Sequence, residues 1–176
     1  LSDTDPTDAS SLDSDADQLN DNWENYYFGD LISTDGTSSS DSDALTDKEE
    51  HDMAADADNP DPFDPDTNPS GTDVSPLDED TDGDGLSDDL ETDTGMWVSV
   101  SDTGTSPVDP DTDDDGYSDG VETNTGTWVS ASDTGTDPFD SDTDDDGLAD
   151  GAETNTGTWV SVSDAGTDPF DSDTDD

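Results

Sequence analysis

The chain has 176 residues, of which 54 are acidic and only Lys48 is basic, so its formal net charge is −53. A charge of this size repels phosphates and excludes direct binding to nucleic acid or to an anionic membrane. Cysteine is absent and there is a single histidine, which excludes disulfides and thiolate sites and argues against zinc or copper chemistry.

Only 23% of the residues are hydrophobic, and such a composition normally leaves a chain disordered, because too little apolar surface is buried to offset the chain entropy. Order therefore requires that the charge be neutralised from inside, for which divalent cations are the obvious candidates. No apolar run approaches the ~18 residues that span a bilayer, and no nucleophile paired with a base is recognisable. We expect neither membrane insertion nor enzymatic activity.

Residues 1–55 contain a first acidic loop, DSDADQLNDNWE at 13–24. A twelve-residue calcium loop takes oxygen ligands from carboxylates at positions 1, 3 and 5, from the backbone carbonyl of position 7, from position 9 directly or through water, and from a bidentate glutamate at position 12. Glycine at position 6 normally makes the turn, and Gln18 replaces it here. The expected ligands are Asp13, Asp15, Asp17, Leu19, Asp21 and Glu24.

A second loop, SSDSDALTDKEE at 39–50, is the weakest copy, because Ser39 stands at position 1 and Ala44 at position 6. We expect the two loops without glycine at position 6 to bind calcium more loosely or to turn differently. Lys48 and His51 are interpreted as solvated side chains. The expected ligands of this divergent loop are Asp41, Asp43, Leu45, Asp47 and Glu50.

A Pro- and Asp-rich connector, 56–79, leads to tandem repeats of 31 residues over 80–176, the last of them truncated. The period is visible in Trp97, Trp128 and Trp159, and segments 111–141 and 142–172 differ at only five positions. Each repeat opens with a loop that has glycine at position 6. The expected ligands are Asp80, Asp82, Asp84, Leu86, Asp88 and Glu91; Asp111, Asp113, Asp115, Tyr117, Asp119 and Glu122; Asp142, Asp144, Asp146, Leu148, Asp150 and Glu153; and Asp173 and Asp175 of the truncated copy.

Coincidence does not explain these loops. A window of this composition matches aspartate at positions 1, 3, 5 and 9 with glutamate at 12 about two times in ten thousand, whereas the chain contains four such matches. Five of its seven glutamates occupy position 12. True EF-hands are a weaker match, because Pro76 and Gly95 leave no room for amphipathic helices around loop 80–91.

Segments 96–100, 127–131 and 158–162 alternate and are rich in β-branched residues, which predicts short strands. The tryptophan found once in every repeat is interpreted as packing against the next repeat. The fold class expected from these patterns is an elongated, calcium-stabilised repeat protein that is mostly irregular, with short helical turns and small β-hairpins.

The runs DTDGDGLSDDLE and DPFDSDTDDDGLADGAE resemble thrombospondin type 3 repeats, particularly their bacterial relatives. The stretch WENYYFGDL followed by DALTDKEE is similar to a segment of large exported proteins of marine bacteria. The resemblance implies an extended, calcium-dependent structure outside cells, without the cysteines that staple the animal repeats. It also implies more than one ion in each repeat, with extra ligands expected at Asp78, Asp109, Asp140 and Asp171.

These patterns together predict a calcium-binding structural region of a secreted or bacterial cell-surface protein, such as a stalk, an adhesin segment or a filament subunit, holding about five or more calcium ions. Subunits this acidic associate only through shared or bridging calcium, as a homo-oligomer or filament. Two alternatives stay open. One is a module that presents its aromatic residues to a glycan or protein ligand, and the other is acidic adaptation to high salt.

Overall fold

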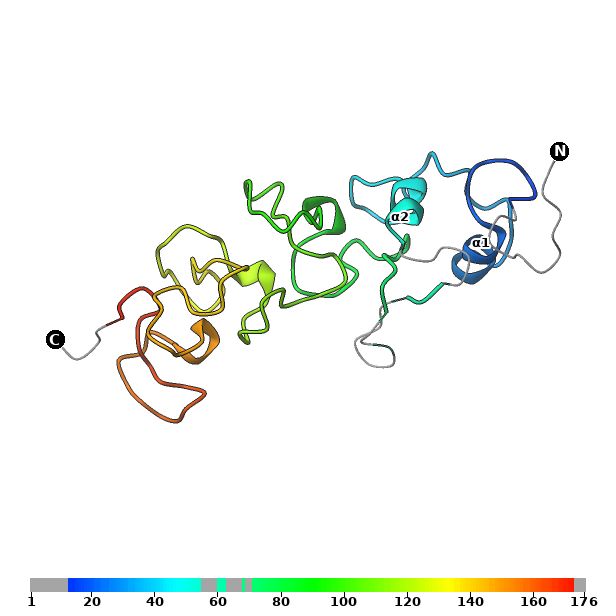
Figure 1. Cartoon of the computed structure of the whole chain (residues 1–176). Coiled ribbons are helices and arrows are strands. Elements are labelled where there is room, and N and C mark those ends of the chain that lie inside the picture. The colour runs from blue at the N-terminus through cyan, green and yellow to red at the C-terminus, as the bar shows by residue number, and fades with distance from the viewer. Residues whose placement is uncertain (1–12, 55–59, 63–67, 69–70, 173–176) are drawn as a thin grey trace. The chain divides into compact units, whose positions relative to one another are not determined.

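The computed structural model describes residues 13–54, 60–62, 68 and 71–172 (Figure 1). The chain divides into two compact units. Unit one comprises Leu1–Asp82 and Ser87–Asp89, and unit two comprises Gly83–Leu86 and Leu90–Asp176. The division runs through loop 80–91, so its residues are described with the unit to which each belongs. The expected Asp173 and Asp175 ligands lie outside the described residues.

The described residues of unit one form two α-helices, α1 (Asp21–Tyr27) and α2 (Asp47–Met53). Each begins at position 9 of its acidic loop, directly after a residue that caps it. The Asn20 side chain accepts a hydrogen bond from the Asn22 amide, and Thr46 forms a reciprocal capping box with Glu49. These caps satisfy amides that have no partner inside a helix, so the loops of unit one run on into true α-helices rather than ending in a single turn.

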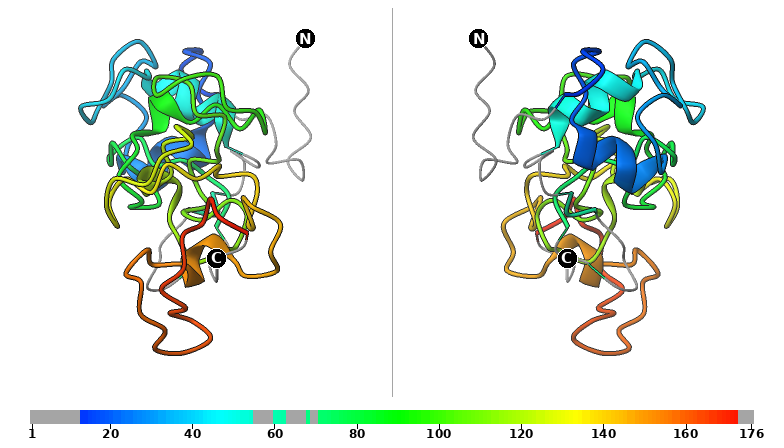
Figure 2. Two further views of the ribbon diagram at one scale, coloured as in Figure 1. Left: turned by 90° about the vertical axis from the view of Figure 1, so that its left-hand side faces the viewer. Right: turned by 90° about the vertical axis from the view of Figure 1, so that its right-hand side faces the viewer.

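The two helices lie side by side (Figure 2). A small aromatic core is formed around Trp23, whose exposed fraction is 0%. Its ring centroid lies 5.2 Å from that of Tyr27 and 5.7 Å from that of Phe28 in α1, and 5.3 Å from that of His51 in α2. Leu19, at position 7 of the first loop, is buried beside this core. The core therefore ties the two divergent loops together through apolar packing.

His51 is not the solvated side chain that the sequence indicates. Its side chain is only 15% exposed, and its Nε2 accepts a hydrogen bond from the Asn20 amide at 3.2 Å. Its Nδ1 lies 3.1 Å from a carboxylate oxygen of Asp52, which also forms an ion pair with Lys48 at 2.8 Å. Because a carboxylate at Nδ1 leaves Nε2 as the acceptor, His51 joins α2 to the cap of α1.

The described part of the connector packs against the same unit. Asp61 donates its amide to the Asp73 carboxylate at 2.8 Å, and the Thr72 amide returns to the Asp61 carbonyl at 2.8 Å. Asp73 and Val74 are both buried, and the Tyr27 hydroxyl donates to the Val74 carbonyl. The connector is thus part of unit one where the structure describes it.

Unit two repeats one backbone pattern every 31 residues. The Asn124 amide donates to the Thr136 carbonyl at 2.9 Å, and the Gly126 amide donates to the Gly135 carbonyl at 2.9 Å. The bonds from residue 93 to 105, 95 to 104, 155 to 167 and 157 to 166 are their counterparts. Up to residue 172, where the description of this unit ends, it forms 3₁₀ turns and no α-helix. These turns are η2 (Asp119–Val121) and η3 (Asp150–Ala152), while η1 (Asp88–Leu90) lies at the boundary between the units.

The short strands expected at 96–100, 127–131 and 158–162 are not formed. Each segment makes one isolated antiparallel bridge, Ser99 with Asp102, Ser130 with Asp133 and Ser161 with Asp164. The β-branched side chains of these segments stay exposed, and the chain closes on itself within four residues, so no second strand is available to extend the pairing. None of the helices in the described residues is long and apolar enough to cross a membrane.

Candidate metal centres

In the loops that have aspartate at positions 1, 3 and 5, these three carboxylates lie close together. In loop 111–122, Asp111, Asp113 and Asp115 each offer an oxygen that lies within 4.8 Å of the other two. Asp13, Asp15 and Asp17 meet the same criterion in the first loop. Three carboxylates at this spacing repel one another unless a cation lies among them, so the geometry suits a metal ion with oxygen ligands.

Backbone amides hold these carboxylates in place. The Asp115 amide donates to Asp111 Oδ1 and Asp113 Oδ1, both at 3.1 Å, and the Gly116 amide donates to Asp111 Oδ2 at 3.0 Å. The Tyr117 amide donates to Asp115 Oδ1 at 2.6 Å. Loop 142–153 repeats every one of these bonds, from the amides of 146, 147 and 148 to Asp142, Asp144 and Asp146.

Position 6 shows how far the divergent loops depart from this pattern. Gly116 and Gly147 take the left-handed φ values of 104° and 97°, and Gln18 takes φ 82° at the same position. Loop 13–24 therefore makes the same turn with a residue that is strained in it. In loop 39–50, Ala44 does not adopt a left-handed φ, so this loop turns differently.

Loop 39–50 still gathers part of its expected set. The Asp43 amide donates to Asp41 Oδ1 at 3.1 Å, and the Leu45 amide donates to Asp43 Oδ1 at 2.8 Å. The hydroxyl of Ser39, which stands where other loops have aspartate, donates to Asp41 at 3.2 Å. A hydroxyl without negative charge at position 1 is a weaker cation ligand than a carboxylate.

Loop 80–91 divides between the units. In unit one, Asp88 and Asp82 are buried and Asp80 is half-buried. In unit two, Asp84 Oδ1 accepts the Leu86 amide at 2.7 Å, and the buried Glu91 accepts the Thr105 hydroxyl at 3.0 Å. Positions 9 and 12 are therefore buried as in the next two loops, whereas the burial of positions 3 and 5 varies from loop to loop.

The residue at position 2, which is not part of the ligand motif, orients the aspartate at position 9. The Thr112 amide and hydroxyl donate to the two oxygens of Asp119 at 2.9 and 2.6 Å. Thr143 does the same to Asp150 at 2.9 and 2.5 Å. Ser14 with Asp21 and Thr81 with Asp88 follow this pattern, and Asp47 accepts the hydroxyls of Ser40 and Thr34. The signal was available in the sequence, because all five loops have serine or threonine at position 2.

The glutamates at position 12 are the most informative groups. All five are buried, with exposed fractions of 0 or 1%. Within the described part of the chain, no hydrogen-bond donor reaches either oxygen of Glu24 or Glu50, or Oε2 of Glu122. Burial is the main cause that raises the pKa of Glu122 to about 9, of Glu50 to about 9 and of Glu24 to about 7, with further increases from neighbouring aspartates. A carboxylate buried without donors is costly, and a bound cation removes that cost.

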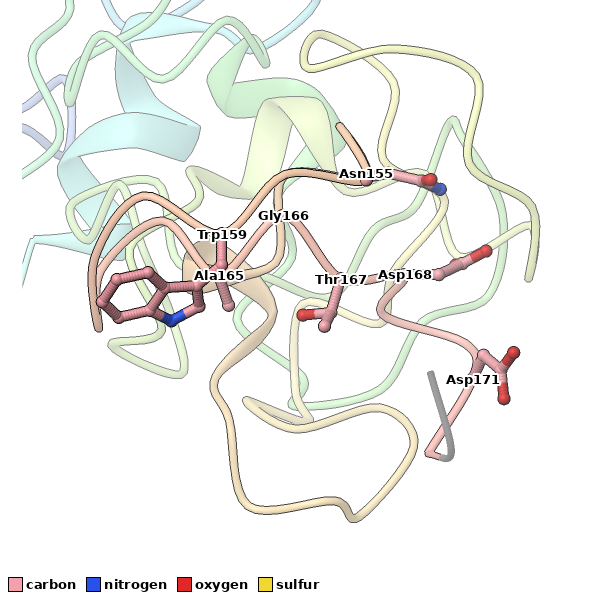
Figure 3. A pocket seen from close by; sticks show the side chains of 8 residues that line it. Asn155, Trp159, Ala165, Gly166, Thr167, Asp168 and Asp171 are labelled. Atoms are coloured by element: carbon pink, nitrogen blue, oxygen red, sulfur yellow. The ribbon is translucent and has the colours of Figure 1, made fainter. Parts of the chain in front are cut away.

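The extra ligands expected two residues before each loop lie near the clusters. Asp78 lines a cavity of about 280 Å³ together with Asp41 in unit one. Burial raises the pKa of Asp109, and the charge of Asp140 adds to the burial of Asp150 in raising the pKa of Asp150. Asp171 and Trp159 both line a cavity of about 330 Å³, and the Trp159 indole extends away from Asp171 (Figure 3).

The donor set of these centres consists of oxygen atoms. Carboxylates and hydroxyls suit a hard cation, and loops that offer about five carboxylates match calcium better than the octahedral, water-rich coordination of magnesium. Comparisons of the chain with protein-family models, with curated proteins and with solved structures gave no match. The loop geometry is therefore the basis on which a function is assigned.

Proposed function

We propose that this chain is a calcium-binding structural region of an extracellular or cell-surface protein, in which Ca²⁺ takes the place of a hydrophobic core. The observation that carries this proposal is the contrast between the two kinds of buried side chain. Apart from proline, only four apolar residues in the described part of the chain are buried, whereas all five position-12 glutamates are. Buried carboxylates stabilise a fold only when a cation is bound among them.

Calcium binding and folding are then one process. Without the ion, the clustered carboxylates repel one another, so the free energy of binding is also the free energy of folding. Loops of this kind in extracellular modules bind calcium at roughly 10⁻⁴–10⁻³ M, which fits the calcium concentration outside cells. The resemblance of the repeats to thrombospondin type 3 repeats supports the same location, and a role as stalk, adhesin segment or filament subunit.

The proposal is tested by far-UV circular dichroism and sedimentation velocity while Ca²⁺ is titrated against EGTA. We expect an ordered, compact chain only in sub-millimolar to millimolar Ca²⁺. Parallel titrations with Mg²⁺ and with molar NaCl are the controls. If NaCl or Mg²⁺ orders the chain as well as Ca²⁺ does, the acidic loops reflect adaptation to salt and the calcium proposal is wrong.

A second candidate is a binding module, supported by apolar side chains that every repeat exposes. Val98, Val129 and Val160 occupy the same place in each repeat and are exposed, and Trp159 is 68% exposed. Trp128 is instead half-buried, with its ring centroid 6.2 Å from that of Tyr117. A glycan array probed with the calcium-loaded chain and with Trp159→Ala separates the two roles, because only a binding module loses signal in the variant.

A further inference from the structure

The aspartate at position 9 in unit two lies against the loop that precedes its own. Asp150 offers an oxygen within 4.8 Å of oxygens from Asp115 and Glu122, which are positions 5 and 12 of the preceding loop. Asp119 has the same relation to Asp84 and Glu91. The position-9 side chain therefore joins a cluster that begins 35 residues earlier in the chain.

Backbone contacts fix this approach. The Gly151 amide donates to Asp115 Oδ2 at 2.9 Å, and the Gly120 amide donates to Asp84 Oδ2 at 2.6 Å. A Cβ atom on Gly151 would lie 2.4 Å from the backbone oxygen of Asp115, and one on Gly120 would lie 2.4 Å from that of Asp84. Such distances are shorter than any van der Waals contact, so only glycine fits at position 10 of these loops.

The cluster formed by Asp115, Glu122 and Asp150 has the features of a cation site. All three side chains are buried, and Oε2 of Glu122 receives no hydrogen bond from the described residues. Each oxygen of Asp150 accepts one bond from Thr143 and retains a second lone pair. Three buried carboxylates this close need a positive charge among them, and the described chain places no basic side chain there.

On this basis, and resting on the calcium-binding function proposed above, we propose that the position-9 aspartate of each repeat is a ligand of the ion held by the preceding loop. Each ion then joins two successive loops, and a loop reaches its full affinity only when the next one is folded against it. The threonine at position 2 orients the shared carboxylate, and the glycine at position 10 allows the two loops to meet.

Unit one contains a related arrangement. Asp88, the position-9 residue of loop 80–91, is buried, and its charge acts on Glu50, the position-12 residue of loop 39–50. Position 10 of loop 80–91 is Asp89 rather than glycine, so the close backbone approach seen at Gly120 and Gly151 belongs to the regular repeats. The position-9 carboxylate thus acts on the preceding loop in both units, and the close backbone approach is found in unit two.

The test uses the full chain and follows calcium binding by the NMR signals of two glycine amides. Gly116 and Gly147 donate to the position-1 aspartates of their own loops, so each signal reports the occupancy of one loop. In Asp150→Asn we expect calcium affinity at Gly116 to fall about tenfold, because a charged ligand is lost, and affinity at Gly147 to change by less. Asp145→Asn is the matched control, since Asp145 is exposed at position 4 of the same loop.

Gly151→Ala provides a second variant that keeps every carboxylate. By pushing the next loop away from Asp115, it should also weaken binding at Gly116 more than at Gly147. The proposal is overturned if Asp150→Asn weakens only the Gly147 loop, which would make position 9 a ligand of its own loop, or if neither loop is weakened. A wild-type chain in which calcium moves neither signal would instead refute the calcium-binding function itself.

Discussion

The two units differ in the side chains they bury and in the residue that makes the turn at position 6 of their acidic loops. Unit one buries Trp23, Leu19 and Val74 and continues two of its loops into α-helices. Among the described residues of unit two, the buried apolar side chains are those of Ala165 and of the prolines at 107, 138 and 169. Unit two keeps glycine at position 6, while unit one makes the same turn with Gln18. Where an apolar core supports a loop, strain in the loop is tolerated; where such a core is nearly lacking, the turn has to be free of strain.

The residues after position 9 explain why unit one forms α-helices there and unit two forms 3₁₀ turns. Residues 22–27 contain no glycine and place Trp23 and Tyr27 one helical turn apart, which lets α1 bury its aromatic face. In unit two, Gly120 and Gly151 interrupt the corresponding positions. The segment TNTG follows Glu122 and Glu153, and TDTG follows Glu91. The chain therefore leaves the helix after a single 3₁₀ turn.

Calcium removal should produce the largest difference between the units. In EGTA we expect unit two to lose its structure completely, because it has almost no apolar core, while part of the Trp23 cluster in unit one survives to lower calcium concentrations. NMR signals of the Gly116 and Gly147 amides and of the Trp23 indole follow both units in one titration. Loss of all three at the same calcium concentration would show that unit one depends on the ion equally.

Removing the aromatic core should act on unit one alone. Trp23→Ala deletes the most buried aromatic ring and should destabilise unit one by about 3–5 kcal/mol, while calcium binding at Gly116 and Gly147 stays unchanged. Trp159→Ala is the matched control, since that indole is exposed. Chemical denaturation in saturating calcium, followed by near-UV circular dichroism, measures both variants. An equal effect of the two substitutions would contradict the assignment of the core to Trp23.

A rise in pH should lower the stability of the ion-free fold but raise the affinity for calcium. Burial raises the pKa of Glu122 and Glu50 to about 9, above the ordinary glutamate value near 4.5. The ion-free fold is therefore most stable below about pH 4.5 and loses that stability as pH rises toward 9. Calcium competes with these protons, so calcium affinity should rise between pH 6 and 8. Circular dichroism in EGTA and calcium titrations across this range test both directions, and Glu122→Gln should flatten both curves relative to the exposed control Glu79→Gln.

The smallest expected effect is an increase in the stability of the first loop. Gln18→Gly should relieve the left-handed φ of 82° and stabilise the calcium-loaded first loop by about 1 kcal/mol. Ala44→Gly should give no such gain, because Ala44 does not adopt a left-handed φ and the substitution only adds freedom to the unfolded chain. Thermal unfolding in calcium compares the two variants. A stabilisation by Ala44→Gly as large as that by Gln18→Gly would show that loop 39–50 turns like the others.

Much of the candidate site is local, and local spacing was enough to predict it. Asp111, Asp113 and Asp115 come together because alternate side chains of a curled segment face the same side, and Gly116 permits the curl. The burial of the position-12 glutamates is less local, because Thr136 and Asp150, both outside loop 111–122, lie against Glu122. Whether these groups hold calcium stays a prediction.

The sequence by itself determined the loops, their period and the excess of negative charge that only cations can neutralise. Three features could be found only in the tertiary structure: the carboxylates beside which Asp119 and Asp150 lie, the partial burial of His51 beside Trp23, and the failure of segments 96–100, 127–131 and 158–162 to pair as strands. All three depend on contacts between residues far apart in the chain or on the lack of a partner strand. A motif of twelve residues does not predict such contacts, because it describes only the ligands that the loop itself supplies.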